Sequence, residues 1–197
     1  MKDNNQFLIL VIGPSGVGKN TLIELFIKKY SNFTFLVTGT ARKKREYEID
    51  GVHRHFYTYE EFEKGIENNE FIEYAKVHQT YYGVPKKSII GPFDKGLSVI
   101  GEVDFQGAYT FQEKVKELPC KLITIFIEFE DEKLFVERIL KREQLSEELI
   151  EIRKESMQKE MEHKNNFDLK QISYENNIEK TFEEFESKIL EKMKELS

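Results

Sequence analysis

Runs of apolar residues and helical patterns follow one another along this chain. Six apolar residues, Phe7 to Ile12, predict a strand that is buried on both faces. The next stretch, Asn20 to Lys29, has its apolar residues at helical spacing. Further strand-like runs follow at Phe33 to Val37, Leu97 to Val103 and Lys121 to Glu128, with helical patterns between several of them. This order predicts an α/β fold in which helices flank a parallel sheet.

The pattern changes between Thr38 and about Gly96. Short alternating runs at His53 to Thr58 and Phe71 to His78 predict strands, and Tyr59 to Asn69 predicts a short helix between them. We interpret residues 38–96 as an inserted α+β lobe, and residues 1–37 and 97–197 as the core domain. Gly91-Pro92 and Gly96 predict a turn before the next strand of the sheet.

The last third of the chain is charged and mostly helical. A final strand is expected near Leu169 to Ile172. A closing amphipathic helix is then expected to pack on the sheet, with its apolar spacing set by Ile178, Phe182, Phe185, Ile189 and Met193. A coiled-coil or interaction helix is the alternative interpretation of this pattern.

Composition narrows the class of protein. The 197 residues include 30 Lys and Arg against 36 Asp and Glu, a formal charge of −6, which argues against broad nucleic-acid binding. The basic run Arg42 to Arg45 could still meet one small anion. The apolar runs are much shorter than the ~20 residues that span a bilayer, so no membrane insertion is expected. Cys120 is the only cysteine, which fits a cytoplasmic protein without disulfides.

A phosphate-binding loop follows the first predicted strand. The stretch from Gly13 to Asn20 matches the pattern G-x-x-x-x-G-K, with Asn20 where Ser or Thr is usual. Its glycines let backbone N–H groups surround a polyphosphate, and Lys19 supplies a mobile cation. The expected binding residues are Gly13, Pro14, Ser15, Gly16, Val17, Gly18, Lys19, Asn20 and Thr21.

Several further segments are similar, in the same order, to those of the guanylate kinase family. This resemblance covers nearly the whole chain. It is carried by GPSGVGK (13–19), VTGTARKKR (37–45), NNEFIEYA (68–75), YYG (81–83), VDFQGA (103–108) and the pattern of Arg138, Arg142, Ser146 to Glu148 and Arg153. The resemblance implies transfer of the γ-phosphate of ATP to GMP, giving ADP and GDP, with dGMP as a further acceptor and Mg²⁺ as the metal ion.

The resemblance also implies an acceptor site in the inserted lobe. Guanine presents two adjacent donors, N1–H and the N2 amine, which one carboxylate can accept together, and Glu73 stands at the matching position. Thr38 matches a hydroxyl that meets the base. Arg42 and Arg45 match two phosphate-binding arginines, and Arg54 replaces a phosphate-binding tyrosine. The acceptor set is Thr38, Arg42, Arg45, Arg54, Glu73, Tyr82, Gly83 and Asp104.

Metal and lid residues follow from the same resemblance. Glu102 and Asp104, two residues apart at the end of a strand, lie on one side of it and are expected to orient Mg²⁺ together with Asn20. Asp104 as a helix N-cap is an alternative that does not exclude this role. The lid is expected at about residues 138–153. The expected catalytic cations are Lys19, Arg42, Arg138, Arg142 and Arg153.

Two departures from the family pattern leave alternatives open. Val84 stands where the family commonly has a hydroxyl that donates to the guanine O6 edge, and Asn20 ends the phosphate loop. Both also fit a same-fold kinase for ribose 1,5-bisphosphate. A non-catalytic binding module on the same scaffold is the third possibility. The expected partners are small nucleotides, and the chain is expected to be a monomer or a homodimer.

Overall fold

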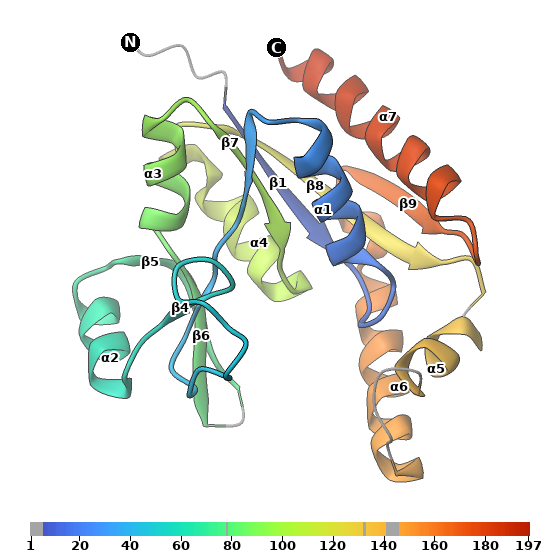
Figure 1. Ribbon diagram of the computed structural model, residues 1–197, viewed down its shortest axis with the longest axis horizontal. Coiled ribbons are helices and arrows are strands. Elements are labelled where there is room, and N and C mark those ends of the chain that lie inside the picture. Colours follow the sequence, from blue (N-terminus) through green and yellow to red (C-terminus); the bar gives the residue numbers. More distant parts are fainter. Residues whose placement is uncertain (1–5, 78, 132, 141–145) are drawn as a thin grey trace.

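The computed structural model describes residues 6–77, 79–131, 133–140 and 146–197. Its main element is a five-stranded sheet in the order β2 (Phe33–Phe35), β7 (Ser98–Glu102), β1 (Phe7–Ile12), β8 (Lys121–Phe129) and β9 (Leu169–Ser173). All neighbouring strands pair in parallel. Every residue of β1 is buried, as its unbroken apolar sequence predicts for a central strand. The α/β prediction is confirmed (Figure 1).

Two apolar clusters cover the two faces of this sheet. The first joins odd-numbered residues of β1, such as Ile9 and Val11, to α1 (Lys19–Lys29), α5 (Lys133–Leu140) and α7 (Ile178–Leu196). Phe185 and Ile189 of α7 are buried in it, which confirms that the closing helix packs on the core. Because side chains alternate along a strand, the odd- and even-numbered residues of β1 contact different sets of helices.

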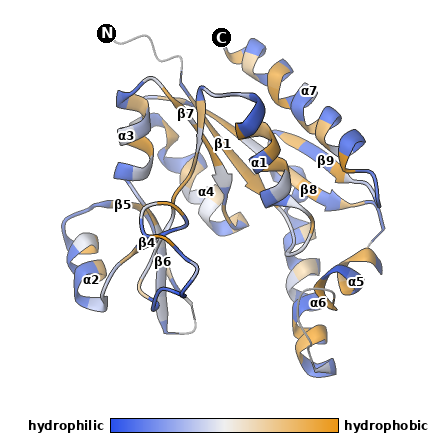
Figure 2. Ribbon diagram, in the orientation of Figure 1, coloured by the Kyte–Doolittle hydropathy of each residue, from blue (hydrophilic) through white to orange (hydrophobic). Residues whose placement is uncertain are grey.

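The second cluster joins the other face to α3 (Lys87–Asp94) and α4 (Phe105–Lys114). Cys120 lies in it and is buried. Figure 2 shows the corresponding hydrophobic colouring of the central strands and the hydrophilic outer faces of the helices. Within the described ranges, no helix has the length and apolarity needed to cross a membrane.

The segment between β2 and β7 forms a second sheet. Its strand order is β4 (His55–Phe56), β3 (Gly39–Thr40), β6 (Thr80–Pro85) and β5 (Phe71–Val77). Helix α2 (Tyr59–Glu67) starts with a capping box between Thr58 and Glu61 and buries Phe62 in a small third cluster. In the view of Figure 1, this sheet and α2 lie at lower left, and α5 and α6 (Glu147–Glu162) lie at lower right.

The second sheet is not separate from the core. Ile72 of β5 and Val84 of β6 belong to the second apolar cluster, together with Leu36 and Val99 of the main domain. The strands that carry the expected acceptor residues are therefore fixed to the main sheet by shared burial. The boundaries 38–96 and the lid at 138–153 stay predictions.

Some predicted elements differ from the observed ones. The prediction of a turn at Gly91-Pro92 is wrong, because both residues lie inside α3, where Ile89 and Phe93 are buried. That burial outweighs the helix-breaking tendency of proline. The turn follows at Gly96, which has a φ of 76°.

Other differences concern the lengths of elements. The strand expected at 53–58 is limited to β4, and the strand expected at 33–37 ends at Phe35. The helix that starts at Phe105 ends at Lys114 and continues as a short 3₁₀ turn, η1 (Val115–Glu117). A second 3₁₀ turn, η2 (Lys164–Asn166), precedes β9. His78, the expected last residue of a strand, lies outside the described residues.

Candidate active site

The phosphate loop joins the end of β1 to the start of α1. Gly13, Gly16 and Gly18 have φ values of 139°, 81° and 105°, in the half of backbone space that side chains disfavour. A Cβ on Gly13 would lie 2.2 Å from the carbonyl oxygen of Ile127 in β8. The glycines are therefore required by backbone conformation at three positions and by the close approach of β8 at Gly13.

Lys19 extends over this loop. Its Nζ donates to the carbonyl oxygens of Gly13 at 2.6 Å and Pro14 at 3.0 Å, and it lies 4.0 Å from a carboxylate oxygen of Glu102. The ammonium group therefore lies at the phosphate loop, and the positive end of the α1 helix dipole points toward the same loop. The arrangement suits an anion of high charge, as the sequence predicts.

One cavity of about 1000 Å³ extends from the phosphate loop to the second sheet. At the loop end it is lined by Gly13, Ser15, Lys19, Asn20, Glu102 and Asp104. At the other end it is lined by Thr38, Arg54, Glu73, Tyr82 and Gly83. The fold therefore brings together, in one space, donor, metal and acceptor residues that the sequence places up to 91 positions apart, as for Gly13 and Asp104.

Two smaller cavities adjoin the outer side of the loop. Cavities of about 560 and 490 Å³ share Gly16, Gly18, Thr21 and Arg138, and the second also includes Val17. Arg138 of α5 donates through Nη1 to the carbonyl oxygen of Val17 at 3.3 Å and to Ser173 Oγ at 3.1 Å. This arginine therefore reaches the phosphate loop from the side of β9, where the resemblance implies a donor role.

Glu73 has an unusual environment for a carboxylate. Burial, the largest cause, and the nearby charge of Asp104 together raise its pKa to about 7, although the charge of Lys114 acts in the opposite direction. Gly107 contributes to this arrangement, because a Cβ there would lie 3.2 Å from Asp104 Oδ1 and 3.6 Å from the carboxyl carbon of Glu73. The missing side chain leaves room for the two carboxylates to lie close together within the cavity.

Lys114 is a residue that the sequence interpretation missed. Its Nζ donates to the carbonyl oxygen of Ile72 at 2.6 Å, one residue before Glu73. It therefore joins the end of α4 to β5 and places a positive charge near the Glu73 carboxylate. A lone lysine at the end of a helix gives no sequence signal for this role.

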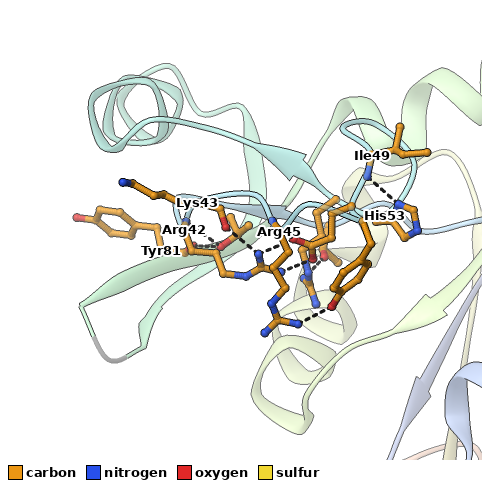
Figure 3. Close-up of polar contacts among 11 residues, drawn as sticks. Arg42, Lys43, Arg45, Ile49, His53 and Tyr81 are labelled. Carbon is orange, nitrogen blue, oxygen red and sulfur yellow. Dashed lines mark hydrogen bonds and ion pairs between the residues drawn. The ribbon is translucent and has the colours of Figure 1, made fainter.

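The basic run contains an ion pair that the sequence interpretation also missed. Arg42 donates through Nη1 and Nη2 to the two carboxylate oxygens of Glu48, and the backbone N–H of Arg45 donates to Glu48 at 2.8 Å (Figure 3). These bonds lower the pKa of Glu48 to about 2, with the Arg42 bond as the main cause. Glu48 is only 6% exposed and lines the large cavity.

The two arginines themselves do not line that cavity in the described part of the chain. Arg45 is exposed and donates to the hydroxyl of Tyr47 at 2.8 Å. In Figure 3 the loop that carries them is closed further along by the bond from the Ile49 N–H to His53 Nδ1, 2.9 Å long. Their role at the acceptor phosphate stays a prediction. The sequence signal for the ion pair was the position of Glu48, an acidic residue six positions after Arg42.

Glu102 is the last residue of β7, and Asp104 stands two residues later, immediately before α4. Asp104 Oδ1 accepts a 2.6 Å bond from the N–H of Gly107 and caps α4, so the alternative interpretation of this residue is confirmed.

Glu160 of α6 is a further residue that the sequence interpretation missed. It lines the same cavity, and burial raises its pKa while the charge of Lys19 opposes that shift. Three acidic side chains thus surround the loop end of the cavity.

The remaining lid residues are only partly described. Arg153 lies half-buried on α6, and it does not line any of the three cavities described above. Arg142 lies outside the described residues. The catalytic roles of both arginines stay predictions.

Comparisons with known proteins agree with this geometry. The sequence profile of the guanylate kinase family matches residues 5–192. A guanylate kinase of Rickettsia bellii is 34% identical over 168 residues, which are 85% of this chain and 86% of that protein. A guanylate kinase of Clostridium tetani is 41% identical over 160 residues, 81% of this chain and 74% of that protein. The crystal structure of guanylate kinase from Anaplasma phagocytophilum matches with a TM-score of 0.68 at 28% identity, covering 98% of this chain and 88% of that chain.

Proposed function

The chain belongs to the guanylate kinase family, and from that premise we propose how its own residues perform the reaction. It is an ATP:GMP phosphotransferase, a nucleoside monophosphate kinase. The observation that carries the proposal is the single cavity with the phosphate loop at one end and Glu73 at the other. Two nucleotides that enter from these ends meet with their phosphates between them. We expect dGMP to serve as acceptor as well.

We propose that the donor triphosphate lies in the phosphate loop. The turned backbone of Gly13 to Gly18 offers N–H groups to the phosphate oxygens, and the start of α1 adds its dipole. Lys19 exchanges its two carbonyl partners for phosphate oxygens when ATP enters. Asn20, Thr21 and Arg138 line the same side of the loop and complete the donor site.

The acceptor base is proposed to lie against Glu73. An ionised carboxylate there accepts from guanine N1–H and the N2 amine together, a pair of donors that adenine does not offer. Thr38, Gly83 and Tyr82 line the same end of the cavity. Arg42 and Arg45 neutralise the GMP phosphate, and Glu48 fixes their loop.

Mg²⁺ fits the loop end of the cavity. Asn20, Glu102 and Asp104 line it together, and within the described residues no group of three or more His, Cys, Asp and Glu side chains is arranged to hold a metal ion. The amide and carboxylate oxygens of these three side chains suit an ion that binds mainly through water and substrate phosphates. We propose that the three side chains hold its water ligands. When bound, Mg²⁺ would neutralise charge on the β- and γ-phosphates.

In the transfer step, an oxygen of the GMP phosphate attacks the γ-phosphorus of ATP. The new P–O bond forms as the bond to the β,γ-bridging oxygen breaks, and ADP leaves with that oxygen. Lys19 and the arginines at 138, 142 and 153 would stabilise the charge on the transferred group. Closure of the acceptor lobe and the lid on the substrates would exclude water as a competing acceptor.

Neither alternative from the sequence is favoured by the comparisons. The family match and the curated relatives all point to GMP rather than ribose 1,5-bisphosphate, and to an enzyme rather than a silent binding module. A cytoplasmic location and a monomeric or homodimeric state stay predictions.

The test is release of ADP from ATP and Mg²⁺ on addition of GMP, followed in a coupled assay. AMP, UMP and ribose 1,5-bisphosphate are assayed in parallel. We expect turnover with GMP and at least about 100-fold less with AMP, because Glu73 leaves an unpaired acceptor opposite adenine. Lys19→Met should abolish turnover, whereas Lys64→Met, which removes an exposed cation on α2, should not. Consumption of the ribose bisphosphate instead of GMP would contradict the proposal.

A further inference from the structure

Arg54 makes a contact that a phosphate-binding residue would not need. Its Nη1 donates to Thr38 Oγ1 at 2.6 Å, and both half-buried side chains line the large cavity. We propose that Arg54 is a positioning residue that fixes the Thr38 hydroxyl as a hydrogen-bond donor to the 6-keto oxygen of the acceptor purine. This inference rests on the proposed function, because it takes guanine as the acceptor base.

The direction of the bond follows from the chemistry of the two groups. A guanidinium can only donate, so the Thr38 oxygen must accept in this pair. A hydroxyl has one proton, and that proton must then point to another acceptor. Within the described part of the chain, no second bond of the Thr38 hydroxyl is formed; the Thr38 carbonyl, by contrast, accepts from the His55 N–H at 2.8 Å. The hydroxyl is therefore oriented as a donor at the cavity wall.

The strand register places Thr38 across the base site from Glu73. Gly39 of β3 pairs with Gly83 of β6, so Thr38, one residue earlier, continues the register opposite Val84. Val84 in turn pairs with Glu73 of β5. Thr38 and Glu73 thus flank Val84 at a separation of two strand spacings, about 10 Å. From these positions, two side chains can reach two different edge atoms of one base.

Val84 itself cannot contribute a polar contact. It has no hydroxyl, it is 1% exposed, and it packs in the second apolar cluster with Ile72 and Ile89. A donor toward the 6-position has to come from a neighbouring strand, and Thr38 supplies it. The positive charge of Arg54 strengthens that donor, because hydrogen bonds in a chain polarise one another.

The expected selectivity follows from the same pair. Guanine presents an oxygen acceptor at the 6-position, whereas adenine presents an amine donor there. The oriented Thr38 proton therefore matches guanine and faces a second donor in adenine. Glu73 accepts hydrogen bonds from the two neighbouring donors, so the two side chains together contact three adjacent groups of the base.

The experiment compares GMP with 6-thioguanosine 5′-monophosphate, in which sulfur, a weak acceptor, replaces the 6-keto oxygen while both Glu73 donors remain. We expect the wild-type protein to favour GMP in kcat/KM by about 10-fold. Arg54→Met and Thr38→Val should each bring that ratio to within about 2-fold of unity and leave the KM for ATP unchanged. Thr38→Ser, which keeps the hydroxyl, should retain most of the preference.

Two controls separate this role from others. Lys64→Met removes a positive charge from the same lobe and should leave the ratio at its wild-type value. The double variant of Arg54 and Thr38 should lose no more than either single variant, because the two residues act as one unit. An equal loss with both substrates in Arg54→Met would overturn the inference and assign Arg54 to the acceptor phosphate.

A second outcome also counts against the inference. If Thr38→Val keeps the wild-type ratio, the hydroxyl does not meet the 6-position. Absence of any GMP turnover in the wild-type protein would instead refute the proposed function. The two failures are therefore distinguishable in the same set of assays.

Discussion

Glu73 is the side chain that we propose to hold the acceptor base, and its charge state is the property to test. Burial raises its pKa to about 7, and only the ionised form accepts two donors at once. We expect kcat/KM for GMP to rise with pH through about 7 and to level off above about 8. Glu73→Gln should lower kcat/KM and remove this rise. A pH profile that persists in the Gln variant would show that another group controls it.

The same shift has a consequence for stability. The folded protein holds the Glu73 proton more tightly than the unfolded chain does, so stability decreases as pH rises from about 4.5 to about 7. Glu73→Gln should therefore raise the melting temperature relative to wild type at pH 8 and not at pH 4. Calorimetry at the two pH values checks this, and an equal effect at both would contradict it.

At the level of single residues, sequence reasoning located side chains that line the large cavity. Thr38, Glu73 and Tyr82 were expected from their motifs, and all three line the cavity. It missed Glu48 and Lys114, which act on other protein groups. Such partners depend on which elements pack together, and that is not visible in local sequence patterns.

Helix α4 shows how one residue can serve both an element and the site. Asp104 caps α4 through Gly107 and also lines the cavity. Asp104→Asn keeps an oxygen for the cap but loses the charge, so we expect near wild-type stability with much lower activity at limiting Mg²⁺. Asp104→Ala should lose the activity and also about 1 kcal/mol of stability.

The measurement is urea unfolding combined with kinetics at varied Mg²⁺. If both variants lost the same stability, the capping bond would contribute nothing measurable. If Asp104→Asn kept full activity at low Mg²⁺, the charge would have no role in organising the ion.

Among the helices and strands, the long and well-buried ones were the easiest to predict from the sequence. The six apolar residues of β1 and the amphipathic pattern of α7 were sufficient to identify both. Strands β3 and β4 have two residues each, too few to show a period. Helix α3 was missed because its Gly-Pro pair resembles a turn, whereas contacts with the main sheet bury Ile89 and Phe93.

For the whole molecule, the shared cavity predicts that the two substrates can be joined. A compound that links adenosine and guanosine through five phosphates should occupy both ends at once. We expect it to bind at least about 100-fold more tightly than GMP alone, because the second contact becomes intramolecular. Calorimetric titration measures this. The control is a compound whose phosphate linker is too short to span the cavity, and this compound should bind no more tightly than ATP.

The rate at which a reagent labels the Cys120 thiol measures how often the folded protein opens. The thiol is buried, and burial raises its pKa to about 12, so it hardly forms the reactive thiolate while the protein is folded. Since no other cysteine is present, a colorimetric thiol reagent reports only the moments when the second apolar cluster opens. ATP and GMP should each slow that labelling, and the ligand that stabilises the folded protein more should slow it more.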